Sequence, residues 1–170
     1  MSDSGSDNVL PALLDSWDRN NAILVNLLRA LPEDALTLRP VEGSPSVGEL
    51  FSHIHYVRLV FVSEDAPEFA QPVSDEWVQA SDRDRMAELL NESAKAVREA
   101  VQGRLAAGRE MDVHFDHPIL LFQHMIWHEG YHHGQIKLTL KLAGRPLANK
   151  DIGPLTRRVW MNKRQAARSS

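Results

Sequence analysis

Apolar residues recur at three- and four-residue steps in four long stretches of this chain. That spacing is typical of helices that bury one face and expose the other. No stretch alternates apolar and polar residues with a period of two, so the pattern indicates no β-strand. The fold class predicted is therefore all-α, a four-helix bundle. The predicted helices cover about 8–31, 46–61, 81–107 and 118–143.

The boundaries of these helices carry recognisable signals. Ser46 stands three residues before Glu49, the spacing of a capping box at a helix start, and Pro118 is well suited to a first helical turn. Residues 63–80 show little periodicity and contain two prolines, which indicates a long crossover loop. A loop of that length can place the third helix beside the second without forcing an antiparallel hairpin.

The chain of 170 residues fits a single domain. We expect a disordered N-terminus at 1–7, the bundle at 8–147, and a C-terminal segment with a basic tail at 148–170. Within that last segment a short helix from Pro154 to Lys163 is predicted to dock through Val159 and Trp160. The tail contains five basic residues and no acidic one, which favours a solvated end of the chain: Arg157, Arg158, Lys163, Arg164 and Arg168.

Composition excludes several classes of function. A formal net charge of −4 argues against a sequence-independent nucleic-acid binder, which needs a basic face. The chain has no cysteine, so disulfides, thiolate metal ligands and cysteine nucleophiles are all excluded. The first residues lack the features of a signal peptide, and no apolar run is long enough to span a membrane. We therefore expect a cytoplasmic protein that binds neither nucleic acid nor membrane.

Histidines on the fourth predicted helix indicate a metal site. His124, His128 and His132 fall with Gln135 within about 80° of one another, on a stripe that otherwise resembles core. Buried polar groups are costly without partners, and one metal ion would satisfy several imidazoles. Two histidines four residues apart can share a metal, so His128 can pair with either His124 or His132.

The third ligand must come from a facing helix. His53 qualifies because it shares a helix face with Leu50, Val57 and Val60, whereas His55 points roughly 200° away. The remaining histidines are interpreted as ordinary residues that bind no metal, since His114 and His117 lie at the entrance of the fourth helix and His133 points about 100° away from its neighbour.

One alternative is a zinc peptidase. His128 to His132 reads His-Glu-Gly-Tyr-His, which matches the HExxH pattern in which Glu129 would activate water. The extended form of the motif fails, because Leu138 stands where a third histidine is expected. A downstream carboxylate ligand would have to be Asp151, beyond the end of the helix, and no strand is predicted that could hold a peptide.

Three sequence blocks together resemble the DinB-like family of helical metal proteins. They are Ser46-Val47-Gly48-Glu49-Leu50-Phe51-Ser52-His53-Ile54, His128-Glu129-Gly130-Tyr131-His132-His133-Gly134-Gln135-Ile136, and Trp17 to Leu28 with Leu31-Pro32-Glu33-Asp34-Ala35-Leu36 after it. The resemblance implies an up-down-down-up bundle, often a homodimer, that binds nickel or zinc through three histidines. Carried over by position, the ligands are His53, His128 and His132, which decides against His124. It gives Glu129 no catalytic role.

The expected chemistry follows from three imidazole ligands. Such a set leaves coordination positions open, as in catalytic rather than structural sites, and suits Zn, Ni, Cu or Fe. The metal would lower the pKa of a bound water or thiol. Some members of the family use a low-molecular-weight thiol, so we expect thiol S-transfer or hydrolysis of a small-molecule substrate. The alternative is a non-catalytic metal- or ligand-binding protein of the stress response. Candidate partners for the ligands or a substrate are Asn21, Glu49 and Gln135.

Overall fold

Four long helices packed side by side form the body of the protein. The computed structural model describes residues 9–32 and 34–161, and within these ranges it contains no strand. The all-α fold class is confirmed. The predicted N-terminal segment 1–7 and the tail residues Lys163, Arg164 and Arg168 lie outside the described residues. The long helices are α1 (Val9–Ala30), α2 (Val47–Asp65), α3 (Arg83–Ala106) and α4 (Pro118–Leu142).

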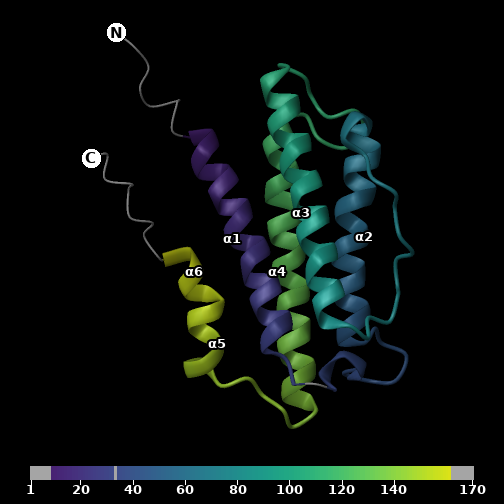
Figure 1. The fold of residues 1–170 in the computed structure, drawn as a ribbon, viewed down its shortest axis with the longest axis vertical. Coiled ribbons are helices and arrows are strands. Elements are labelled where there is room, and N and C mark those ends of the chain that lie inside the picture. Colours follow the sequence, from purple (N-terminus) through teal and green to yellow (C-terminus); the bar gives the residue numbers. More distant parts are fainter. Residues whose placement is uncertain (1–8, 33, 162–170) are drawn as a thin grey trace.

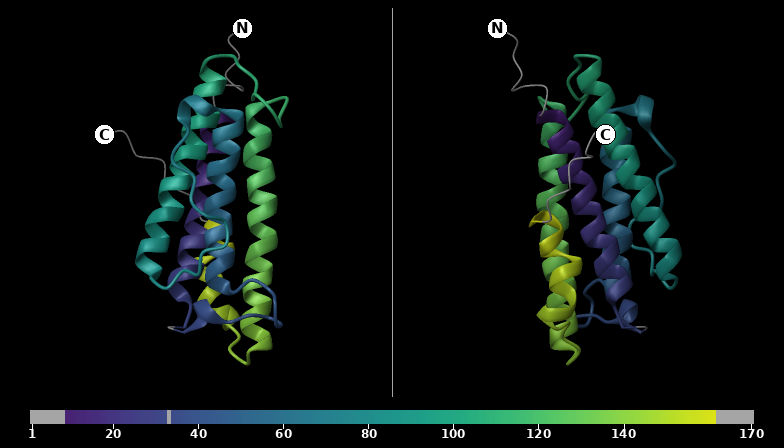
Figure 2. Two further views of the ribbon diagram at one scale, coloured as in Figure 1. Left: turned by 90° about the vertical axis from the view of Figure 1, so that its right-hand side faces the viewer. Right: turned by 60° about the vertical axis from the view of Figure 1, so that its left-hand side comes forward.

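The helices follow an up-down-down-up path. Figure 1 shows α1 and α4 running in one direction and α2 and α3 in the other. The crossover between α2 and α3 returns along the outside of the bundle, as Figure 2 shows from two further sides. Two short 3₁₀ turns interrupt the connections, η2 (Ala35–Thr37) before α2 and η3 (Pro67–Phe69) after it. None of the described helices combines the length and hydrophobicity needed to cross a membrane.

The start of α2 is fixed by a capping box and by the crossover that lies against it. Ser46 accepts a hydrogen bond from the Glu49 amide, and the Glu49 carboxylate accepts one from the Ser46 amide. At Gly48 a Cβ atom would lie 2.8 Å from the Ala80 carbonyl oxygen and 2.5 Å from Nε2 of Gln79. The absence of a side chain at Gly48 therefore lets residues of the crossover pack against α2.

The interior is apolar apart from a few paired groups. Trp17 of α1 is fully buried, stacks on Phe122 of α4 with ring centroids 5.4 Å apart, and donates its indole N–H to the Ala94 carbonyl at 2.8 Å. The stripe of α4 that carries His128 and His132 leaves the core toward the end of the helix, where Leu142 is 62% exposed. The face of α2 that carries His53 is half-buried, so His53 lies at the edge of the core.

The C-terminal segment forms two short helices, α5 (Asn149–Leu155) and α6 (Arg157–Met161), where one was expected. Both contact α1. Their anchors are Ile152, which is 2% exposed, and the buried Thr156. The predicted anchor Trp160 is wrong, because its side chain is 42% exposed. The first of them, α5, begins at Asn149, five residues before the predicted start at Pro154, which lies inside that helix.

Candidate metal centre

Three histidines from two helices converge at one point. His53 comes from α2, and His128 and His132 come from successive turns of α4. The Nε2 atom of His128 lies 3.2 Å from that of His53 and 3.0 Å from that of His132. Ligand nitrogens about 2.0–2.1 Å from a tetrahedral metal are separated by about 3.3 Å, so these spacings suit a shared ion. Within the described part of the chain this is the group of metal-ligating side chains that could hold an ion.

The crossover fixes the orientation of His53. Its Nδ1 atom lies 2.9 Å from Oε1 of Glu76, and a carboxylate oxygen can only accept a hydrogen bond from it. The indole of Trp77 stacks on the imidazole, with ring centroids 4.4 Å apart and planes 2° from parallel. The proton of a neutral His53 therefore lies on Nδ1, and the lone pair of Nε2 points toward the other two rings.

A neighbour on α4 does the same for His132. Nδ1 of His132 lies 2.7 Å from the amide oxygen of Gln135, and the amide nitrogen of Gln135 donates to the Tyr131 hydroxyl at 3.1 Å. Because that amide oxygen accepts, the Nδ1 atom of His132 carries the proton. The Nε2 atom of His132 then also presents a lone pair to the centre of the cluster.

The electrostatic setting keeps the three rings neutral. Burial lowers the pKa of His53, His128 and His132 below the usual value for imidazole. For His128 burial and the nearby rings of His132 and His53 together lower the pKa to about 3. Neutral imidazoles are the form that binds metals.

The hydrogen bonds inside the cluster cannot satisfy all three rings. Two lone pairs, those of His53 and His132, face the single Nε2 of His128, which can donate at most one proton. Nδ1 of His128 is buried and has no hydrogen-bond partner among the described residues. A cation at the centre would accept all three lone pairs at once, so the donor set fits a divalent transition metal.

The other candidate histidines have separate roles. His124 lies outside the cluster, and its ring packs edge-on against Phe61 with centroids 5.1 Å apart. The buried His55 points away, and its Nδ1 atom lies 2.9 Å from the Leu89 carbonyl oxygen. The structure thus groups His132 rather than His124 with the other two, as the resemblance implied. Metal binding by these residues stays a prediction.

Of the three residues predicted to contact the ligands or a substrate, one contacts the cluster and two have other partners. Gln135 contacts a cluster histidine. Glu49 caps α2 and pairs with Arg39 at 2.7 Å, and Asn21 donates to Asn91 at 2.7 Å. Glu76, which orients His53, was missed because it lies in the aperiodic crossover, where spacing gives no indication of position. His117, at the entrance of α4, accepts a hydrogen bond from the Ile119 amide through Nδ1 and so caps the helix.

Glu129 does not face the cluster. Its side chain is 1% exposed and forms an ion pair with Arg58, with Nε to Oε1 at 2.6 Å and Nη2 to Oε2 at 2.9 Å. Asn20 donates to the same carboxylate at 2.5 Å. A carboxylate engaged in this way cannot also activate a water on the metal, so the geometry argues against the peptidase hypothesis.

Two small cavities border the residues that orient the cluster. One of about 270 Å³ is lined by Trp77, which stacks on His53, and the other of about 170 Å³ by Gln135, which binds His132. Ser44 and Pro45 line both. Both cavities therefore lie at the loop that precedes α2, next to residues that contact the cluster histidines.

Comparison with known proteins identifies the family. No curated protein and no solved structure matches this chain significantly. The model of the DinB family matches residues 1–158, nearly the whole length. The three-histidine cluster stands on α2 and α4, in the two blocks that carried the resemblance. The chain therefore belongs to the DinB family.

Proposed function

We propose that this protein binds one divalent transition metal, zinc or nickel, through His53, His128 and His132, and acts on a small molecule. The observation that carries the proposal is the convergence of three Nε2 atoms, with the lone pairs of His53 and His132 directed inward by Glu76 and Gln135. When bound, the ion would supply Lewis acidity that favours a thiolate or hydroxide near neutral pH.

Accessibility favours a catalytic over a structural site. Structural zinc sites are closed by four protein ligands, whereas this cluster offers three. The side chain of His53 retains 13% of its exposure, and the cluster lies at the edge of the core. The residues around it leave room for a substrate beside Trp77 and Gln135.

Thiol S-transfer is the first reaction we propose, with hydrolysis as the second. The chain contains no cysteine, so a thiol nucleophile must be a free, low-molecular-weight cosubstrate. The walls of the bordering cavities are partly apolar, through Leu50 and Leu138, and partly polar, through Ser44 and Gln135. They suit a small molecule that combines a polar thiol with an apolar acceptor.

A cobalt-substituted form tests this proposal. The d–d spectrum should change when bacillithiol, mycothiol or glutathione is added, because thiolate coordination alters the ligand field. The same titration of His124→Ala should give the same change, since His124 lies outside the cluster. An unchanged spectrum with all three thiols would contradict the transferase proposal, and the hydrolase proposal would then be tested with small esters and amides.

One observation favours a second candidate, a non-catalytic metal- or ligand-binding protein. Two carboxylates beside the cluster are already engaged, Glu76 with His53 and Glu129 with Arg58. Neither of them is then free to move a proton. Full metal occupancy without turnover of any thiol or ester substrate would support this candidate.

A further inference from the structure

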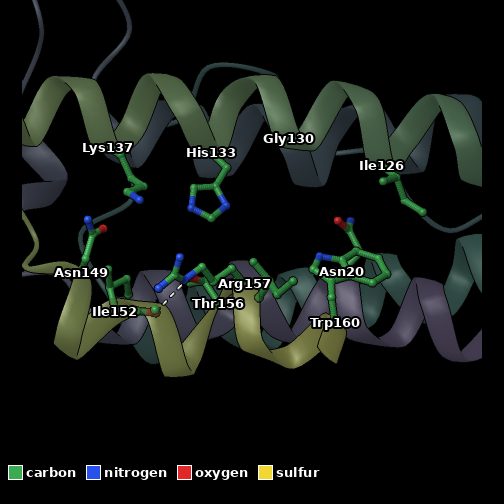
Figure 3. Close-up of a pocket in the computed structure, with 12 residues that line it drawn as sticks. Asn20, Ile126, Gly130, His133, Lys137, Asn149, Ile152, Thr156, Arg157 and Trp160 are labelled. Atoms are coloured by element: carbon green, nitrogen blue, oxygen red, sulfur yellow. Dashed lines mark hydrogen bonds between the residues drawn. The ribbon is translucent and has the colours of Figure 1, made fainter. Parts of the chain in front are cut away.

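A separate cavity of about 300 Å³ lies on another side of α4, between that helix and α1, α5 and α6 (Figure 3). Residues 126, 130, 133 and 137 line it at steps of four, three and four, which places them on one stripe of α4. The cluster histidines 128 and 132, together with Gln135, form a different stripe, centred roughly 160° around the helix. A cavity of this volume is at the lower end of the range of small-molecule sites and suits one small organic molecule.

One end of this cavity is cationic. Lys137 of α4 and Arg157 of α6 extend into it from opposite walls, and His133 extends from α4 beside Lys137 (Figure 3). No Asp or Glu is among the residues that line it. Within the described part of the chain neither Lys137 nor Arg157 has an ion-pair partner. Two cations facing one space repel each other, and an anion between them would relieve that repulsion.

The other end of the cavity is apolar and aromatic. Trp160 and Ile126 lie there, across from the cationic end, together with the amide of Asn20 (Figure 3). This placement also explains why Trp160, which does not anchor α6 in the core, is directed toward α4. A pocket with one aromatic wall and a few convergent polar groups is the usual form of a small-molecule site.

We propose that this cavity is a second binding site, specific for a small organic anion. The carboxylate of the ligand lies between Lys137 and Arg157, and its apolar or aromatic body lies against Ile126 and Trp160. Charge-assisted hydrogen bonds from both cations provide recognition of the head group. The site is independent of the metal function proposed above, since none of the cluster histidines lines it.

Gly130 makes the proposal testable by steric means. It lines the cavity, and a Cβ atom built on it would meet nothing within 4 Å. A Gly130→Leu side chain would therefore extend into the empty space without disturbing the helix. Gly134 is the matched control, because it is also an α4 glycine with nothing within 4 Å and does not line the cavity.

The probe is benzoate, with benzamide as its neutral analogue, and binding is measured by isothermal titration calorimetry. Benzoate should bind the purified protein at least about tenfold more tightly than benzamide, as expected when a charge-assisted hydrogen bond is lost. Lys137→Gln, Arg157→Gln and Gly130→Leu should each weaken benzoate by about tenfold or more. Gly134→Leu should bind as the unmodified protein does.

A carboxylate could also bind a metal ion, so the titration is repeated with His53→Ala. Unchanged affinity in that variant supports the cavity, whereas loss of binding shows that benzoate binds at the cluster and overturns the proposal. The absence of benzoate binding, or equal binding by Gly130→Leu, also overturns it. None of these outcomes bears on metal content, so the two proposals fail separately.

Discussion

Arg58 and Glu129 form an ion pair at the centre of the bundle, with the side chains 0% and 1% exposed. Arg58 also donates to Asn21 at 2.9 Å and to the Leu90 carbonyl at 2.7 Å. The pair therefore links α1, α2, α3 and α4. Glu129 follows a cluster histidine directly, so this ion pair helps to set the rotation of α4 at the candidate metal centre.

Removal of one partner should be costly. Glu129→Gln would leave the Arg58 charge buried without a counter-charge, and such a loss typically costs about 3–5 kcal/mol. We expect a correspondingly lower free energy of unfolding in urea. The exposed pair of Arg85 with Glu92 supplies the control, and Glu92→Gln should change stability by less than about 1 kcal/mol. Unaltered stability of Glu129→Gln would contradict the structural role assigned to this carboxylate.

The metal content of alanine variants should distinguish the three cluster histidines from His124, the neighbouring histidine on α4. His53→Ala, His128→Ala and His132→Ala should each strongly reduce the roughly one equivalent of metal expected, because every one removes a ligand. His124→Ala should retain full occupancy, because its ring packs against Phe61 and Phe115 instead. Elemental analysis of untagged protein gives the result. An empty site in His124→Ala with a full site in His132→Ala would show that the ligand assignment is wrong.

The helices and two of the three cluster residues follow from local spacing, because periodicity depends on the chain alone. Local spacing cannot decide between His124 and His132 as the third ligand, since both lie four residues from His128. The choice depends on where along α4 the neighbouring α2 places His53, which is a property of packing. The family resemblance selected His132 because members of one family share the same packing of these two helices.

Glu76 could not be predicted from the sequence for a different reason. It lies in the crossover between α2 and α3, where the backbone follows no regular period and side-chain direction depends on the contacts of the loop. The residue that anchors α5 and α6 also depends on contacts with the rest of the fold, so its prediction from the sequence was wrong. Trp160 is the largest apolar residue there, but the smaller Ile152 reaches the core and Trp160 lines a cavity.

Glu76 should affect metal affinity through His53. Loss of a hydrogen-bond acceptor behind a metal-binding histidine typically costs about 10–100-fold in affinity, so Glu76→Ala should weaken metal binding by that order. Glu76→Gln can still accept the Nδ1 proton and should restore most of the affinity. Competition with a chromogenic chelator measures both. Asp75→Ala, an exposed neighbour, is the control, and an equal loss in that variant would indicate a general effect on the loop.

Replacing two helical glycines by alanine should have opposite effects on the stability of the fold. At Gly48 a Cβ would lie 2.8 Å from the Ala80 carbonyl oxygen, so Gly48→Ala must displace the crossover and lower the melting temperature. At Gly130 nothing lies within 4 Å, and alanine should stabilise the helix by up to about 1 kcal/mol. Thermal unfolding followed by circular dichroism compares them. A similar change in both variants would argue against close packing of the crossover on α2.

Asp112 should contribute to the acid sensitivity of the fold. Hydrogen bonds from the Arg104 guanidinium, at 2.6 and 2.9 Å, lower the pKa of the Asp112 carboxyl from its usual value. A folded-state pKa below the unfolded one means that the ionised carboxylate stabilises the fold at neutral pH. That stabilisation decreases as the pH falls below about 4, the ordinary value for Asp, and is lost once the folded-state carboxyl is protonated.

Asp112→Asn should therefore lower the melting temperature at pH 7 and reduce its further decrease on acidification. Melting temperatures measured from pH 7 to pH 2 would show the two curves converging at the acid end. Asp116→Asn is the matched control, because the structure gives that exposed carboxylate no ion pair within the described residues. Parallel curves for Asp112→Asn and the unmodified protein would mean that the bond to Arg104 contributes nothing to stability, and the buried guanidinium would then depend on Glu68 alone among its carboxylate partners.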